Sequence, residues 1–324
     1  MTPDIFAEWL RRRGHIVLRT ESSYWYDQGF RVYQAFPYHW VLQPSETELS
    51  EFLKIVGGIG LRFSTTLGAL RGCISYHIVS KESPYDISLL DKNTRYNIRL
   101  GLKNCHIEKI SFENLAYQGW ELQEDTLKRQ GREKSMNFES WKRLCLSAQG
   151  LPGFEAWGAI IKGNLGASAI VCQIEDWCYV LYSLSHHKYF PLKINNAINY
   201  IITKEILGRP EINYLLRGVH SLDAPPTLDD FKFRMGYIPK PVRQRVVFHP
   251  WLQPLVNSLS HGIIKKSIAF KQGHPTLAKA EGMMRFYLEG LKPLKEQQWP
   301  ACLEDNQEQI LATAMNGHPR RTIS

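Results

Sequence analysis

The stretch Ile212–Tyr237 constrains the fold of this chain more than any other (INYLLRGVHSLDAPPTLDDFKFRMGY). It begins with an apolar run that is typical of a buried strand, and it continues through a charged connection that contains two adjacent prolines. It ends in a short helical pattern that carries Phe231, Lys232 and Gly236. A buried strand that leads directly into a polar loop and a helix predicts an α/β layer with polar groups at the strand end.

The segment before it repeats the same order of elements. Trp177–Ser185 is rich in aromatic and aliphatic residues and predicts a strand, 186–196 is a polar loop, and Ala197–Leu207 has the apolar spacing of a helix. Further upstream, Ser45 followed by Glu48 is a capping-box pattern and predicts a helix over 46–56. This mixture of strands and helices predicts an α+β fold.

The residues and their order together resemble the GNAT superfamily of acyltransferases, in particular the branch with Fem-type peptidyltransferases and their acyl-CoA-using relatives. The likeness is carried by the strand, loop and helix after Trp177 and by the motif FKFRMGY. It implies two pseudo-related lobes, each with a mixed, mostly antiparallel sheet flanked by helices. We expect an acceptor-side lobe over 1–90, a donor-side lobe over 91–247, a helical extension over 248–299 and a mobile tail over 300–324.

The resemblance also implies where an acyl donor binds. In the GNAT fold the donor lies where two neighbouring strands separate, and its pyrophosphate sits at the N-terminus of the next helix, where unpaired N–H groups attract anions. The corresponding residues here are Lys188, Lys193, Asn195 and Asn196. No glycine occurs between His186 and Ala197, which departs from the glycine-rich loop of the family, and the two asparagines fit helix caps equally well.

Lys232 is the first candidate for a catalytic residue. In the Fem-like pattern, a Phe-Lys pair followed by a Gly-aromatic end implies a lysine near the transferred acyl group, and Tyr237 completes that end. A lysine there can hold the oxygen that becomes negative in a tetrahedral transition state. The alternative is a surface lysine that lies along an amphipathic helix.

Arg95 and Arg99 are expected to bind substrate together with Tyr237. With Lys103 they recur every four residues and therefore lie along one face of a predicted helix. In the resembling family an Arg-rich segment joins the first lobe to the second. The alternative is a solvated helix face that pairs with acidic neighbours.

Acyl transfer to an amine also needs a group that accepts the proton of the ammonium. The candidates are Asp223, which follows a predicted strand, and the histidines His186, His187 and His220. Of these, Asp223 and His186 are our predicted catalytic residues. Each has a structural alternative, because an aspartate before a turn is often a cap and single histidines are often buried structural groups.

Composition restricts partners and compartment. Lys and Arg total 40 against 31 Asp and Glu, and the net charge of +9 suits an anionic ligand such as a coenzyme or tRNA. The six cysteines form no CxxC pair, which indicates free thiols in a reducing compartment, and the predicted sites include no metal. Without an apolar run of about 18 residues or a signal-like N-terminus, we expect a cytoplasmic protein with no integral membrane association.

These observations predict an N-acyltransferase. It would move an acyl group from an acyl-CoA thioester to an amine of a small-molecule or envelope-precursor acceptor, with acyl-CoA as co-substrate, no permanently bound cofactor and no DNA partner. One alternative is a Fem-like peptidyltransferase that uses aminoacyl-tRNA, since the positive charge also suits tRNA. Another is a non-catalytic binding protein with the same fold.

Overall fold

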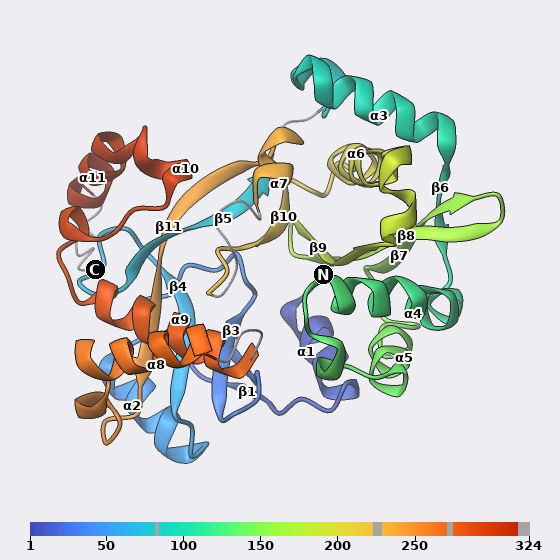
Figure 1. Ribbon diagram of the computed structural model, residues 1–324. Helices are drawn as coiled ribbons and strands as arrows, with labels where there is room; N and C mark the ends of the chain where they lie inside the picture. Colours follow the sequence, from blue (N-terminus) through green and yellow to red (C-terminus); the bar gives the residue numbers. More distant parts are fainter. Residues whose placement is uncertain (82–83, 223–228, 271–274, 317–324) are drawn as a thin grey trace. The chain divides into compact units, whose positions relative to one another are not determined.

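The computed structural model describes residues 1–81, 84–222, 229–270 and 275–316, and the chain forms two compact units (Figure 1). Unit 1 consists of Met1–Gly14, Ile78–Gly218 and Asp229–Ile238. Unit 2 consists of His15–His77, Val219–Leu228 and Pro239–Ser324. The chain thus passes between the units repeatedly, and strand β5 (Cys73–Ser80) contains one of these passages.

Unit 1 is built on five neighbouring strands. In spatial order they are β10 (Tyr214–Val219), β9 (Trp177–Ser185), β8 (Asn164–Ile174), β7 (Phe154–Ile161) and β6 (His106–Ile110). β10 runs parallel to β9, whereas the other neighbours pair antiparallel. The sheet of this unit is therefore mixed and mostly antiparallel.

Helices cover both faces of that sheet (Figure 1). α6 (Ile194–Leu207) contacts β7 and β8 on one face, with α3 (Lys92–Asn104) packed on α6, and α4 (Phe112–Arg129) covers the other face beside α5 (Phe138–Leu146). The remaining elements of unit 1 are α1 (Pro3–Arg12), α7 (Asp230–Arg234) and three short 3-10 helices, η1 (Ile87–Leu89), η2 (Glu133–Ser135) and η3 (His187–Leu192).

The N-terminal helix α1 belongs to the core of unit 1, although it is far away in sequence from its neighbours. Phe6 and Trp9 are buried, and their rings lie 6.4 and 5.2 Å from the ring of Phe154. The indole N–H of Trp9 donates to the carbonyl of Leu144 at 3.3 Å. Burial of such large aromatic side chains contributes strongly to stability.

Unit 2 contains a second mixed set of strands, in the order β1 (Val17–Arg19), β2 (Tyr24–Asp27), β3 (Val32–Phe36), β4 (Gly60–Thr65) and β11 (Ile238–Phe248). Only β3 and β4 pair in parallel among these neighbours. One apolar cluster packs α2 (Glu46–Ile55) against this sheet through buried residues that include Trp25, Phe52 and Phe63. The expected fold class, mixed and mostly antiparallel sheets flanked by helices, is confirmed.

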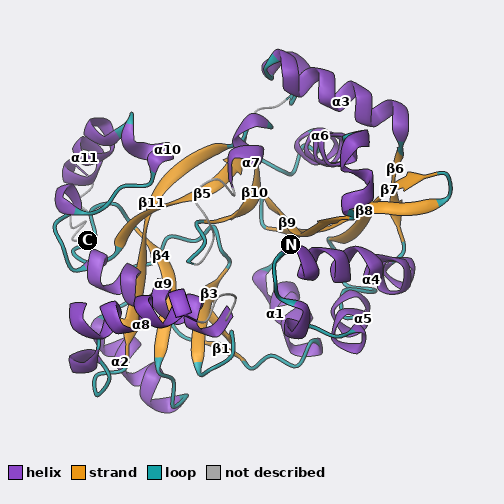
Figure 2. Cartoon of the chain, viewed as in Figure 1, coloured by secondary structure: helices purple, strands orange, loops and turns teal. Residues whose placement is uncertain are grey.

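The C-terminal part of unit 2 is helical (Figure 2). It contains η5 (Gln253–Leu255), α8 (Ser258–Phe270), α9 (Pro275–Gly290), η6 (Leu294–Glu296), α10 (Ala301–Glu304) and α11 (Gln307–Asn316). The sequence predicts a mobile tail from residue 300, whereas the structure has α10 and α11 there, with Leu303 and Ile310 buried. Within the described residues, every helix is too short or too polar to cross a lipid bilayer.

Candidate functional site

Strands β9 and β10 separate toward their carboxyl ends. Their parallel pairing joins Tyr214 to Trp177 and ends where Leu216 faces Tyr179, although β9 continues to Ser185 and β10 to Val219. Tyr182 has a φ of 42°, and the register between β8 and β9 shifts in the same region. A bulge of this kind bends a strand away from its partner, so this structure has the strand separation that the resemblance implies.

Arg217 lies at the point where the two strands part, directly after the last paired residue of β10. Its Nη2 donates to the Ser183 hydroxyl on β9 at 3.5 Å, and its guanidinium carbon lies 5.9 Å from the ring centre of Tyr237. Its buried Nε has no hydrogen-bond partner among the described residues. Burial lowers the pKa of Arg217, yet an arginine stays charged in a protein. A half-buried cation with a buried, unused donor favours an anionic or strongly polar ligand.

Lys232 reaches the same place from helix α7. Its side chain is 21% exposed, and its Nζ donates to Asp229 at 2.7 Å. Burial lowers the pKa of Lys232, the Asp229 carboxylate opposes that shift, and the charge of Arg217 adds to it. A Cβ atom added to Gly218 would lie 3.9 Å from this Nζ, so the lysine lies against the residue that follows Arg217. Two cations therefore converge where the strands separate.

Tyr237 forms part of the wall beside these cations. Its hydroxyl is 2.5 Å from the hydroxyl of Thr203 on α6, its side chain is buried, and burial raises the pKa of its phenol. Tyr85 donates its hydroxyl proton to the Met235 carbonyl at 2.5 Å and so ties the end of α7 to the segment after β5. The ring of Tyr237 thus faces Arg217, and an aromatic ring is a favourable neighbour for a cation. The hydroxyl of Tyr237 contacts α6 through Thr203.

The loop predicted to bind the donor contains η3 and begins α6 at Ile194. Lys193 adopts a left-handed conformation with a φ of 58° and is the N-cap, so neither Asn195 nor Asn196 caps the helix. Asn196 instead directs its Nδ2 to the sulfur of Met235 at 3.7 Å. This contact brings the first turn of α6 next to the segment that ends α7.

The backbone amides of this loop bind to groups of the protein itself. The amide of His187 donates to the Asp125 carboxylate at 3.1 Å, and that of Lys188 donates to Nδ1 of His186 at 3.2 Å. The Lys188 ammonium pairs with Glu121 at 2.9 Å. The carboxylates of Glu121 and Asp125 thus lie beside the first residues of the loop in which the resemblance puts a pyrophosphate, and such carboxylates repel phosphates.

His186 and His187 both lie on the carboxylates of α4. His186 is 3.3 Å from Glu121 and 3.8 Å from Asp125, while His187 hydrogen-bonds to Asp125 through its Nδ1. Since Nδ1 of His186 accepts from the Lys188 amide, a neutral His186 holds its proton on Nε2, toward Glu121. Ligand atoms of Asp125, His186 and His187 come within 4.8 Å of one another, although Arg129 also pairs with Asp125 at 2.9 Å.

This cluster makes a testable contribution to stability. Burial raises the pKa of Asp125, but hydrogen bonds from His187 and Arg129 outweigh it and lower the pKa from 3.8 to about 2. The stabilisation is therefore present above pH 3.8 and is lost as the pH falls through about 2. We expect Asp125→Asn to reduce the free energy of unfolding by about 1–2 kcal/mol at pH 7, with the difference shrinking toward pH 2. Urea unfolding at both pH values checks this.

Glu124→Gln is the matched control, because Glu124 is exposed on the same helix. We expect this substitution to change the unfolding free energy by less than about 0.5 kcal/mol. An equal loss for both variants, or a loss for Asp125→Asn that persists at pH 2, would contradict the role of the cluster.

The other predicted residues lie in different surroundings. Arg95 is half-buried and Arg99 is exposed on α3, and neither side chain makes a hydrogen bond or ion pair with a described residue. His220 belongs to unit 2, where its ring stacks on Tyr76 at 4.6 Å and its Nδ1 is 3.3 Å from the Ser75 hydroxyl. Asp223 lies outside the described residues.

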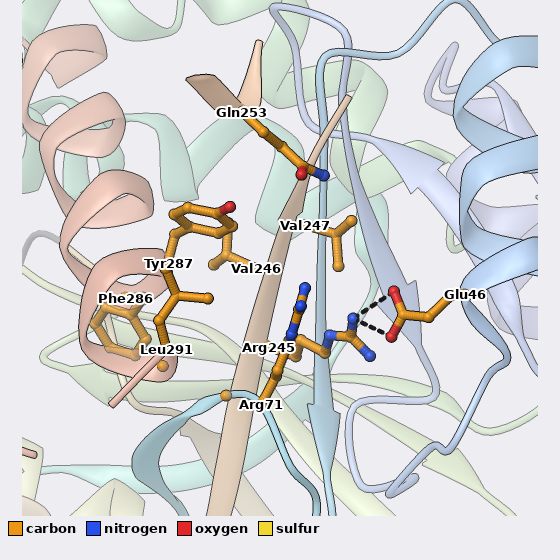
Figure 3. A pocket seen from close by; sticks show the side chains of 11 residues that line it. Glu46, Arg71, Arg245, Val246, Val247, Gln253, Phe286, Tyr287 and Leu291 are labelled. Carbon is orange, nitrogen blue, oxygen red and sulfur yellow. Dashed lines mark hydrogen bonds and ion pairs between the residues drawn. The ribbon is translucent and has the colours of Figure 1, made fainter. Parts of the chain in front are cut away.

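Two further groups of residues are poor sites for this chemistry. Cys172 and Cys178 are buried and burial raises the pKa of both thiols, to about 12 for Cys178, so neither is an activated nucleophile. A small pocket of unit 2, with a volume of about 20 Å³, is lined by Arg245, whose guanidinium pairs with both oxygens of Glu46 at 2.5 and 2.7 Å (Figure 3). That volume holds about one water molecule and no substrate.

The sequence analysis missed Arg217 and Asp229. The signal for Arg217 was present, because a single charged residue interrupts the apolar run YLLRGV of a predicted buried strand. The signal for Asp229 was weaker, since three residues before Lys232 is the ordinary spacing of a helical ion pair. Arg217, Asp229 and Lys232 together form a small charged site.

Solved structures of other proteins superimpose on this chain and identify its fold. No family model matches the chain, and no curated protein matches it in sequence. The structure of FemX superimposes with a TM-score of 0.55 at 10% identity, over 78% of this chain and 92% of FemX. The C-terminal domain of a putative lysylphosphatidylglycerol synthetase from Agrobacterium fabrum superimposes with a TM-score of 0.51 at 11% identity, over 82% and 91% of the two chains. The chain therefore shares its fold with FemX, as the sequence resemblance implied.

Proposed function

We propose that this chain is an acyltransferase that forms an amide by direct attack of an amine on an activated acyl group. The observation that carries the proposal is the convergence of Lys232 and Arg217 where β9 and β10 separate. Two partly buried cations beside separated strands provide both a place for an extended acyl donor and positive charge for an oxyanion. The shared fold with FemX supports the same reaction class.

The proposed reaction is a direct transfer of the acyl group from the donor to the amine nitrogen of the acceptor. The ammonium of the acceptor loses a proton, and its nitrogen lone pair attacks the acyl carbonyl carbon to form a C–N bond. The carbonyl oxygen becomes negative, and the Lys232 ammonium, held by Asp229, stabilises it. The oxyanion then collapses, the bond to the thiolate sulfur or ribose oxygen breaks, and the second proton of the attacking nitrogen passes to that leaving group, which leaves a neutral amide. Asp223 is our predicted acceptor of the first proton.

Between the two donor classes, the loop before α6 favours an aminoacyl ester on tRNA over a coenzyme A thioester. The amides of His187 and Lys188 are bound within the protein, and Glu121 and Asp125 place negative charge beside them. A pyrophosphate would have to displace these contacts. The net charge of +9 suits tRNA, whose binding depends on many phosphate contacts. Arg95 and Arg99, which pair with no described residue, are proposed to contact its backbone.

Calorimetric titration with aminoacyl-tRNA, acetyl-CoA and a longer acyl-CoA, each at two salt concentrations, tests the proposal. We expect saturable binding of aminoacyl-tRNA that weakens steeply with salt, and little binding of either thioester. Saturable binding of an acyl-CoA would move the assignment to the thioester donor that the sequence analysis put first. If no donor binds, the alternative of a non-catalytic protein with this fold gains support and the proposed reaction fails.

A further inference from the structure

Unit 2 contains a large apolar cavity that the proposed reaction does not use. Its volume is about 340 Å³, within the range of pockets that hold small organic ligands. The lining comes from strands β3, β4 and β11, from η5 and from helices α8 and α9. Most of the lining residues are apolar, and they include Val32, Phe248, Val256, Met283 and Met284.

Two helices form one wall of this cavity and lie side by side (Figure 2). On α9 the lining residues recur at three- and four-residue intervals and so occupy one helix face: Thr276, Lys279, Ala280, Met283 and Met284. On α8 they are Ser260 and Ile264, again one turn apart. Methionine side chains adapt to flexible apolar ligands, because they are unbranched and polarizable.

The polar part of the lining is positive. Arg62 and Lys279 line the cavity, whereas no Asp or Glu is among its described lining residues. The Arg62 side chain is held in place by the Gln244 side-chain oxygen at 2.7 Å and the His220 carbonyl at 2.6 Å. Lys279 is exposed and makes no hydrogen bond or ion pair with a described residue. An apolar cavity with cationic and no acidic groups is complementary to a ligand with an apolar body and an anionic end.

The entrance of the cavity is also apolar. Phe30 and Leu255 line it and are 71% and 60% exposed. Exposed apolar side chains that line a cavity give an acyl chain a path that avoids water.

We propose that this cavity binds the acyl chain of an anionic amphiphile, with the negative head at Lys279 on the rim. A free long-chain carboxylate and an anionic phospholipid share this chemistry. The inference rests on unit 2 alone and does not depend on the reaction proposed above, because Arg217, Asp229 and Lys232 belong to unit 1 and are not among the described residues that line the cavity.

Fluorescence titration of the full chain with cis-parinarate, followed by displacement with palmitate, tests the proposal. We expect saturable binding that Ala280→Phe weakens at least 10-fold, because the added ring fills the cavity. The same substitution at Ala278, which is on α9 but not in the lining, is the matched control and is expected to leave affinity within about 2-fold. Melting temperatures verify that each variant is folded.

A charge reversal provides a second measurement that folding cannot confound. Lys279→Glu is expected to weaken palmitate about 5- to 10-fold and to leave hexadecanol, which lacks the charge, unchanged. Lys265→Glu is the control, since Lys265 is exposed on α8 and does not line the cavity.

Cosedimentation with phosphatidylglycerol vesicles, against phosphatidylcholine vesicles, distinguishes the two sources of the ligand. Binding to phosphatidylglycerol that Ala280→Phe removes would identify the phospholipid, whereas palmitate binding without vesicle binding would identify the free acid. If neither ligand binds, or if Ala280→Phe and Ala278→Phe behave alike, the proposal is overturned.

Discussion

Replacing Lys232 by alanine is expected to lower kcat by about 100- to 1,000-fold, the usual loss when one oxyanion donor is removed. The ammonium is held by Asp229 at 2.7 Å, so its position is fixed before substrate binds. Steady-state transfer of a labelled aminoacyl group checks this loss. Lys204→Ala, which removes an exposed lysine from α6, should leave kcat unchanged.

A pH profile separates this role from a structural one. Burial lowers the pKa of Lys232 below 10.5, so activity of the natural protein should decline with rising pH earlier than an ordinary lysine would allow. Lys232→Arg keeps the charge and should move this alkaline decline to higher pH while recovering part of kcat. An unchanged profile in that variant, or full activity in Lys232→Ala, would rule out the assignment.

Arg217→Met is expected to reduce kcat/KM at least 30-fold while leaving the free energy of unfolding unchanged or higher. The reason is that Arg217 is half-buried with a buried, unused Nε donor, and an apolar side chain of similar length removes the cost of desolvating that charge. Desolvation of the Arg217 charge costs free energy of folding, and a ligand that binds to this charge would explain why an arginine stands here. Transfer kinetics and urea unfolding on the same preparation measure both quantities.

Arg209→Met gives the opposite pattern and serves as the control. Arg209 pairs with the partly buried Glu155 at 2.9 Å, so its removal leaves that carboxylate with less compensation and should destabilise unit 1 by about 1–3 kcal/mol. The Arg209→Met variant should keep its transfer activity at temperatures below its melting temperature. If Arg217→Met instead loses stability and keeps its activity, Arg217 is a structural residue and the proposed site loses one of its two cations.

Local patterns in the sequence predicted local structure well. Strand β9 has the bounds expected for it, Trp177–Ser185, because its aromatic and aliphatic run is bounded by polar residues on both sides. The Ser45 hydroxyl caps α2 by accepting from the amide of Glu48 at 3.1 Å, as the capping pattern predicts. The carboxylate of Glu48, however, binds the hydroxyl and amide of Ser22. That partner is distant in sequence and no local rule identifies it.

The site itself depends on such distant contacts. Lys232 could be proposed from a short motif, but its neighbour Arg217 is brought to it only by the packing of α7 against β10. Similarly, the polarity of the loop before α6 indicated a ligand site, whereas its amides turn out to be bound by Asp125 and His186. Sequence periodicity reports which face of an element is buried, and it does not report which charged groups meet there.

The position of α1 within unit 1 affects the order of folding during synthesis. α1 leaves the ribosome before the sheet that it packs against, because the indole of Trp9 binds a carbonyl 135 residues further along the chain. At about 5–20 residues per second, α1 waits for roughly 7–27 s before that partner has been made. Phe6, Trp9 and Leu10, all fully buried in the folded protein, remain accessible during that time. We therefore expect chaperone binding to α1 while its partner strands are still being made.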